Sequence, residues 1–131
     1  MTEYDEYFDY LRQRSRLGLI YRKYWLYPRS AKLLSGKALD IGCGIGDFLR
    51  YRPNTVGVDI NPNTVNWCKT QGLEVKVMEV DQIPFNNNEF NSAILDNVLE
   101  HIMNPEPILS EVHRVLDKDG IFIVGVPGTL G

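Results

Sequence analysis

The stretch LDIGCGIGDF at residues 39–48 decides the fold of this chain. It joins an apolar segment to the start of a helix through three alternating glycines. Glycine adopts backbone angles that other residues avoid and lets a ligand approach the main chain. The helix start that follows offers free N–H groups and a partial positive charge. The stretch predicts a strand, a tight turn and a helix that cradle a nucleotide-like ligand, and a turn without a ligand stays open as the alternative.

The spacing of the glycines distinguishes two classes of cofactor. Gly42, Gly44 and Gly46 follow Asp40, whereas the dinucleotide fingerprint G-x-G-x-x-G requires a glycine at the position of Asp47. An acid followed by G-x-G-x-G resembles the first motif of the class I S-adenosylmethionine-dependent methyltransferases, in particular the type 11-like group. The resemblance implies S-adenosylmethionine as cofactor, and an NAD-dependent oxidoreductase is the less favoured hypothesis.

A second acid ends the next short apolar run, at residues 55–59. Asp59 lies about 20 residues beyond the start of the glycine loop, where folds of this kind place the carboxylate that binds ribose hydroxyls. A carboxylate accepts from both hydroxyls of a vicinal diol. The alternative role for Asp59 is to balance the dipole of the helix that begins at Asn61 and Pro62. In the resembling family the next residue, here Ile60, often lies against the adenine face, with core packing as its alternative.

The third acid, Asp81, follows a strand-like run at residues 74–80. Together with Gln82 and Ile83 it resembles the family segment whose acid accepts a hydrogen bond from the adenine amino group. The resemblance implies that Asp81 recognises the base and that Gln82 and Ile83 belong to the cofactor site. Position alone leaves a solvated turn acid equally open.

The fourth apolar run, residues 90–96, is followed by further candidates. Ligands of open α/β sheets bind outside the carboxyl ends of the strands, so the resemblance implies that Asp96 and Asn97 face the methionine half and the acceptor. Loop capping is their alternative. His101 is the candidate general base, although backbone bonding or packing is favoured for it. Methyl transfer from a sulfonium depends mainly on alignment and exclusion of water, so no base is required.

The cysteines carry less information than the acids. The resemblance places Cys43 in the cofactor-binding loop with Asp40 and the three glycines, and its thiol is interpreted as a packing group and not a nucleophile. Cys43 and Cys68 lack the spacing of a metal site or of a CxxC motif. Both are expected to be reduced thiols, and no metal site is expected.

The order of the segments predicts an α/β fold. Strands are expected near residues 37–42, 55–59, 74–80, 90–96 and 120–126, and helices near 46–52, 62–71 and 104–117. This alternation predicts a parallel sheet. The crossover rule and the resemblance give a three-layer Rossmann-like class I methyltransferase fold with strand order 3-2-1-4-5.

The last two segments give more specific expectations. The apolar run after Gly120 predicts a buried fifth strand, preceded by a turn at residues 117–120. In the helix before it, Glu111, His113 and Arg114 have no spacing typical of metal ligands and are interpreted as solvated surface.

Residues 1–36 differ in composition from the rest of the chain. They contain six of the seven tyrosines. Their charges are separated along the chain, with acidic residues within 3–9 and basic residues from Arg12 onward. We expect an N-terminal helical cap at 1–36, followed by the S-adenosylmethionine-binding domain at 37–131, in one compact domain. The cap is either a lid that shapes an acceptor pocket or an amphipathic helix packed on the sheet.

Length and composition limit the function. The 131 residues suffice for one core, and a net charge of -3 argues against a nucleic-acid substrate. No long apolar run or signal segment is evident, so no membrane contact and a cytoplasmic location are expected. Family members usually continue beyond the fifth strand, so we expect either a shortened chain or a homodimer paired along that edge. The predicted function is methyl transfer to a small-molecule acceptor, with a cofactor-binding module without turnover as the alternative.

Overall fold

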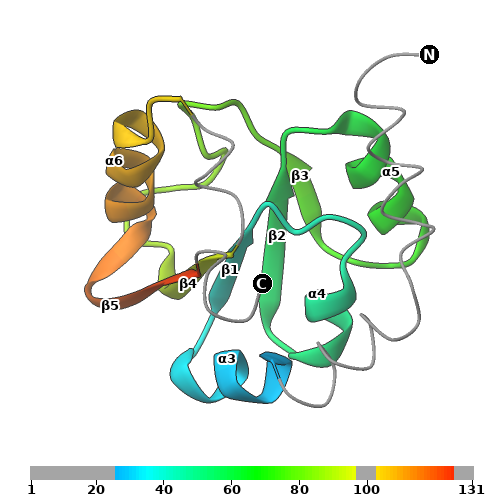
Figure 1. Cartoon of the computed structure of the whole chain (residues 1–131), viewed down its shortest axis with the longest axis horizontal. Coiled ribbons are helices and arrows are strands. Elements are labelled where there is room, and N and C mark those ends of the chain that lie inside the picture. Colours follow the sequence, from blue (N-terminus) through cyan, green and yellow to red (C-terminus); the bar gives the residue numbers. More distant parts are fainter. Residues whose placement is uncertain (1–25, 97–102, 126–131) are drawn as a thin grey trace.

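The computed structural model describes residues 26–96 and 103–125, whose helices and strands are shown in Figure 1. In chain order the elements are α3 (Tyr27–Leu33), β1 (Ala38–Ile41), α4 (Asp47–Tyr51), β2 (Thr55–Asp59), α5 (Pro62–Thr70), β3 (Val75–Val77), β4 (Phe90–Asp96), α6 (Glu106–Val115) and β5 (Leu116–Gly125). A helix separates consecutive strands everywhere except between β3 and β4, where residues 78–89 form an irregular segment.

The described strands form one parallel sheet in the order β3-β2-β1-β4-β5. β1 is central, and its last residue, Ile41, pairs with Val58 of β2 and Leu95 of β4. The predicted α/β class and strand order are therefore confirmed. The chain leaves β1 in one direction towards β2 and β3 and returns to its other side as β4. The carboxyl ends of β1 and β4 therefore flank the point where strand order reverses, which is the usual ligand site of such sheets.

Helices cover both faces of the sheet, giving the three predicted layers (Figure 1). α4 and α5 lie on one face, where Leu49 and Val65 belong to one buried cluster. α6 lies on the other face, where its residues Ile108, Val112 and Val115 join a second cluster with apolar residues of β1, β2 and β4. The irregular segment 78–89 shares this second face with α6, because its residues Met78 and Ile83 belong to the same cluster.

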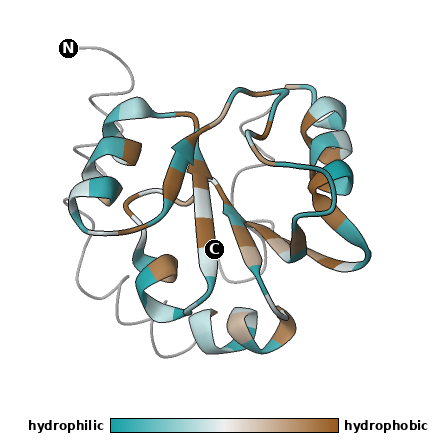
Figure 2. Ribbon diagram, turned by 180° about the vertical axis from the view of Figure 1, so that it is seen from behind, coloured by the Kyte–Doolittle hydropathy of each residue, from teal (hydrophilic) through white to brown (hydrophobic). Residues whose placement is uncertain are grey.

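The hydropathy of the ribbon follows this layering. Apolar residues concentrate along the strands between the layers, and hydrophilic residues lie on the outer parts of the helices (Figure 2). Such a distribution is expected when each helix buries only one stripe of side chains. None of the helices in the described part of the chain combines the length and the apolar character needed to cross a membrane.

β3 is shorter than predicted. It ends at Val77 instead of near residue 80. The main chains of Glu79 and Gln82 bond to each other, N–H to carbonyl in both directions, at 3.1 and 3.3 Å. This tight turn takes the chain away from the sheet directly after Met78.

β5 differs from the predicted buried strand. β5 begins at Leu116 and therefore includes residues 117–120, where the sequence predicts a turn. The register with β4 shifts at these residues, because Phe90 pairs with Leu116 and Ser92 pairs with Ile121. Ile121 and Val124 are 44% and 41% exposed. The expectation of a buried strand is wrong because β5 pairs only with β4 within the described residues and is therefore an edge.

Of the predicted N-terminal cap, the structure describes α3 and the residues that lead into β1, while residues 1–25 lie outside the described residues. Tyr27 is 9% exposed and packs edge-on against the ring of Phe48 in α4, with centroids 5.2 Å apart. Leu34, Ala38 and Ile94 are the other buried members of this cluster. This part of the cap therefore packs on the sheet.

Candidate cofactor-binding site

The glycine loop after β1 has a left-handed backbone at all three glycines. φ is 75° at Gly42, 57° at Gly44 and 85° at Gly46, angles that residues with a side chain rarely adopt. The amides of Gly42 and Cys43 both donate to the carbonyl oxygen of Val58 in β2, at 2.8 and 3.1 Å. These bonds fix the loop against the end of the neighbouring strand.

Asp59, the last residue of β2, connects the glycine loop to the start of α5. Its Oδ2 accepts from the Gly44 amide at 3.0 Å, and its Oδ1 accepts from the Asn61 amide at 2.9 Å. A carboxylate has roughly four lone-pair positions, so about two remain for donors of a ligand. The residue is 5% exposed. Burial raises the pKa of Asp59, and the two amide bonds oppose that shift.

Asn61 fixes the beginning of α5 and so the far side of Asp59. Its side-chain oxygen accepts from the amides of Asn63 and Thr64, at 3.0 and 3.4 Å. Pro62 follows in the first turn, where its missing N–H leaves no bond unmade. The predicted cap of α5 is therefore present and is provided by Asn61.

Two thiols pack against the glycine loop. The Sγ atoms of Cys43 and Cys68 lie 3.7 and 3.3 Å from the carbonyl oxygen of Gly44. Both cysteines are free and buried, as expected for packing groups. Their mutual hydrogen bond, together with burial, raises the pKa of Cys43, so this thiol stays protonated. Gly57 of β2 leaves room for it, since a Cβ there would lie 2.6 Å from Cys43 Sγ.

The remaining predicted residues near this loop differ in exposure. Asp40 is 7% exposed within β1, and Gly46 is buried at the start of α4. Ile60, in contrast, is 41% exposed directly after Asp59. Its side chain is therefore available for contact with a flat apolar group, and it is not part of the core.

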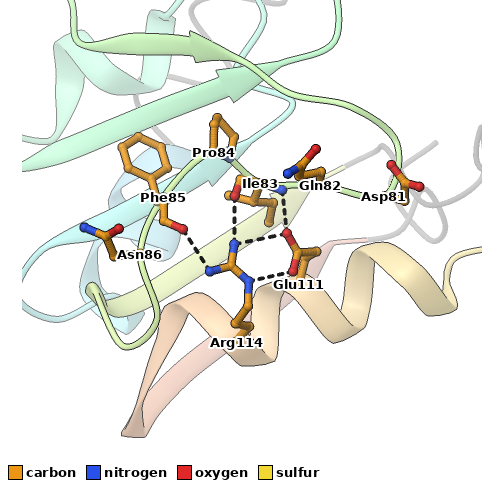
Figure 3. A pocket seen from close by; sticks show the side chains of 8 residues that line it. All are labelled: Asp81, Gln82, Ile83, Pro84, Phe85, Asn86, Glu111 and Arg114. Atoms are coloured by element: carbon orange, nitrogen blue, oxygen red, sulfur yellow. Dashed lines mark hydrogen bonds and ion pairs between the residues drawn. The ribbon is translucent and has the colours of Figure 1, made fainter.

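The third predicted acid lies in the irregular segment after β3. Asp81 is exposed within the tight turn between Glu79 and Gln82. A pocket of about 530 Å³ opens beside this segment (Figure 3). Its lining consists of Asp81, Gln82, Ile83, Pro84, Phe85, Asn86, Glu111 and Arg114. Asp59 and the glycine loop are not in this lining, so the pocket covers only the third-acid part of the predicted site.

Ile83 is held inside the protein. Its side chain is 1% exposed and belongs to the core under α6. Its amide donates to Glu111 Oε1 at 2.8 Å, and its carbonyl accepts from Arg114 at 2.8 Å. In this structure the side chain and both main-chain polar groups of Ile83 therefore have partners within the chain.

Glu111 and Arg114 are not the solvated surface residues that the sequence pattern indicated, and this interpretation is corrected. Arg114 Nε lies 2.6 Å from Glu111 Oε2, and these side chains are only 32% and 17% exposed. Both also bind the backbone of the irregular segment. The sequence held a signal for the ion pair between Glu111 and Arg114, because opposite charges three residues apart lie on the same face of a helix. Their backbone partners, however, depend on the path of a segment without periodicity. His113 is exposed, as expected.

The exit of the fourth strand is described in part. The main chain of Asp96 ends β4 and pairs with Gly125 of β5. The side chain of Asp96, and Asn97 and His101 as a whole, lie outside the described residues. Within the described ranges, no group of three or more His, Cys, Asp or Glu side chains is arranged to hold a metal ion.

Comparison with known proteins places this geometry in a family. Residues 39–124 match the methyltransferase domain model. The chain is 29% identical over 124 residues to the uncharacterized protein MJ1123 of Methanocaldococcus jannaschii, covering 95% of the chain and 57% of that relative. It is 31% identical over 123 residues to the mitochondrial arginine-hydroxylase NDUFAF5 of Homo sapiens, covering 88% of the chain and 34% of that relative.

A solved structure supports the fold. A S-adenosylmethionine-dependent methyltransferase from Thermotoga maritima, described as a possible histamine N-methyltransferase, superposes with a TM-score of 0.71 at 24% identity. The match covers 92% of this chain and 60% of that structure. The chain thus spans about a third to three fifths of the length of these proteins. The family match runs from β1 through the glycine loop and Asp59 into β5. On this evidence the chain belongs to the methyltransferase domain family.

Proposed function

We propose that this protein is a S-adenosylmethionine-dependent methyltransferase that acts on a small-molecule acceptor. The observation that carries the proposal is the bond between Asp59 at the end of β2 and the Gly44 amide of the loop after β1. This bond holds an acid with open lone pairs beside a left-handed glycine loop, at the edge where sheets of this class bind ligands.

The first half of the site suits the ribose and the amino-acid part of the cofactor. The loop offers main-chain groups without side chains in the way, and Asp59 accepts from vicinal hydroxyls. Ile60 packs against the base. S-adenosylmethionine carries its methyl group on a cationic sulfonium. The carboxylates of Asp40 and Asp59, near the carboxyl ends of β1 and β2, favour a cation nearby. The cofactor-binding residues assigned to this half are Asp40, Gly42, Cys43, Gly44, Gly46, Asp59 and Ile60.

The second half of the site suits the base and the acceptor. The exposed Asp81 carboxylate accepts from the adenine amino group, with Gln82 beside it. Ile83 supports this turn from the core. We assign the methionine end and the acceptor to Asp96 and Asn97, with His101 as the candidate base.

A dinucleotide cofactor fits less well. The position where the dinucleotide motif requires glycine carries Asp47, which lies in the first turn of α4 and forms an ion pair with Arg50 at 3.5 Å. A pyrophosphate approaching that turn would meet this carboxylate.

A second candidate is a module that binds the cofactor but transfers no methyl group. It is favoured by the human relative, whose name is that of a hydroxylase. A small acceptor is supported by the described function of the Thermotoga maritima enzyme and by the net charge of -3, which disfavours nucleic acid.

A transfer assay separates these candidates. The protein is incubated with S-adenosylmethionine radiolabelled on the methyl group and with a panel of amines, phenols, thiols and carboxylic acids. Transfer to a panel member that Asp59→Ala abolishes, and that the exposed-site control Asp119→Ala retains, supports the methyltransferase. Cofactor binding without transfer to any member contradicts it and supports the binding module.

A further inference from the structure

Arg114 links α6 to the irregular segment through the two terminal nitrogens of its guanidinium. Nη2 donates to the Ile83 carbonyl at 2.8 Å, Nη1 to the Phe85 carbonyl at 2.9 Å, and Nη1 also to Asn87 Oδ1 at 2.9 Å. Nε and Nη2 bind the two oxygens of Glu111, at 2.6 and 3.0 Å. A planar fork with five donors serves acceptors in several directions at once, which a lysine ammonium cannot do with the same geometry.

Glu111 completes the contact from the same helix face. Its Oε1 accepts from the Ile83 amide at 2.8 Å. The two α6 side chains therefore bind both main-chain polar groups of one residue, whose side chain is itself fixed in the core. Figure 3 shows Arg114 lying between α6 and this segment, with Glu111 beside it.

The irregular segment needs such partners because it has few of its own. Main-chain groups that belong to no helix or sheet must find other acceptors and donors. Among the described residues, the bonds that join main-chain groups within 79–86 are the pair between Glu79 and Gln82 and one from the Phe85 amide to the Ile83 carbonyl. The carbonyls of Ile83 and Phe85 are bound by Arg114. The path of this segment is therefore set by α6.

The residues fixed in this way directly follow the exposed turn. Asp81 and Gln82 are exposed, and the next residue, Ile83, is fixed at its side chain, amide and carbonyl. A binding residue on an irregular loop gains precision when its neighbours are fixed by buried and hydrogen-bonded groups. The bonds of α6 therefore limit where the carboxylate of Asp81 can lie.

We propose that Arg114 and Glu111 are positioning residues for adenine recognition: they hold residues 81–86 so that the Asp81 carboxylate meets the amino group of the base. This inference rests on the proposed function, since it requires that the cofactor carries adenine. It adds a role for two side chains of α6, which act on the position of Asp81 through the main chain of Ile83 and Phe85. The loss of either residue lets the turn move, and the site then distinguishes bases less well.

The chain provides a matched control in a second ion pair. Lys37 Nζ lies 2.9 Å from Glu89 Oε2, and the side chains are 36% and 21% exposed, close to the 32% and 17% of Arg114 and Glu111. Lys37 precedes β1 and Glu89 precedes β4. This pair therefore lies at the amino ends of the parallel strands, away from the edge where the ligand is placed. Glu89 Oε1 also accepts from the Asn86 amide at 3.0 Å, and a substitution of Lys37 leaves both of these groups in place.

The test compares S-adenosylhomocysteine with S-inosylhomocysteine, in which an oxygen replaces the amino group of the base. Dissociation constants are measured by calorimetry for the parent, Arg114→Met and Lys37→Met. The parent is expected to prefer the adenine compound. Arg114→Met should weaken binding of that compound about tenfold, as loss of a supporting contact typically does, and should also reduce the preference. Lys37→Met should keep the affinity for the adenine compound and the preference for it within about twofold of the parent, as expected for a contact away from the ligand.

Each other outcome has a defined meaning. If the parent binds neither compound, the proposed function fails. If the parent binds both equally, or if a folded Arg114→Met keeps the affinity and the preference, the inference fails while the proposed function stands. The inference fails also if Lys37→Met loses the preference to the same extent. Should Arg114→Met not fold by circular dichroism, Arg114→Lys takes its place, because it keeps the charge and the apolar stem but not the fork.

Discussion

The carboxylate of Asp59 accepts a hydrogen bond from the Gly44 amide, so the acid that ends β2 and the glycine loop that follows β1 form one unit. The same carboxylate binds the Asn61 amide at the start of α5. One buried side chain thus determines the relative positions of a loop, a strand end and a helix start. A ligand bound at this carboxylate would contact a site whose main chain is already positioned.

The pH dependence of cofactor binding should report on Asp59. Burial raises the pKa of this carboxyl in the folded protein. Its contribution to the free energy of unfolding therefore falls as pH rises from the unfolded pKa through the folded one. Ribose hydroxyls donate to the ionised form, so S-adenosylhomocysteine should bind more tightly as pH rises through the folded pKa. Calorimetry between pH 4 and 7, with circular dichroism to confirm the fold, tests this. Equal or weaker binding at the higher pH would contradict the role of Asp59.

Glu111→Gln should destabilise the protein in a pH-dependent manner. Hydrogen bonding to Arg114 lowers the pKa of Glu111, so its stabilising contribution is present above the unfolded pKa and is lost as pH falls through the folded one. At pH 7 the substitution should cost on the order of 1 kcal/mol in urea unfolding, because charge-assisted bonds become neutral ones. The difference from the parent should shrink at acid pH. A cost that is constant with pH would argue against the ion pair as its source.

Gly57→Ala should destabilise the loop and the sheet together. A Cβ at this position would lie 2.6 Å from Cys43 Sγ and 2.9 Å from Leu49 Cδ1, so side chains on two elements must move. Overpacking of this kind costs about 1–3 kcal/mol. Gly72→Ala is a useful comparison, since it meets no atom within 4 Å but has a φ of +76° and thus reports strain without overpacking. A stable Gly57→Ala with unchanged unfolding would show that the loop packs less tightly than described.

Asn61→Ala should remove the cap of α5. The side chain accepts from the amides of Asn63 and Thr64, and it is 1% exposed. Loss of such a cap costs roughly 0.5–2 kcal/mol. Asn61→Asp should keep most of the stability, since a carboxylate oxygen accepts the same bonds. Thermal unfolding of both variants checks this, and an Asp variant as unstable as the Ala variant would assign the loss to a contact other than the cap.

The sequence identifies those parts of the fold and site that depend on local pattern. The glycine loop, the parallel sheet and the cap at Asn61 follow from backbone freedom, alternation of segments and the residues that begin helices. The strand order follows from the crossover rule and the family resemblance. The packing role of Cys43 likewise follows from its position between two glycines.

Other features depend on which segments meet in space. The predicted strand order already puts β5 at the edge of the sheet. The exposure of Ile121 depends on how much of this strand the other elements cover, which an apolar run does not reveal. The early end of β3 follows from one turn. The bonds of Arg114 require the path of residues 81–86, which has no periodicity, although the charge spacing on α6 gave a partial signal.

Calorimetric titration of S-adenosylhomocysteine into the protein and into Asp59→Ala tests the central claim most directly. We predict micromolar binding to the parent, at least tenfold weaker binding to the folded variant, since charge-assisted bonds to the hydroxyls are lost, and no comparable binding of NADH to either. No binding of S-adenosylhomocysteine or S-adenosylmethionine to the folded parent, or equal binding to Asp59→Ala, would contradict the assignment of this site.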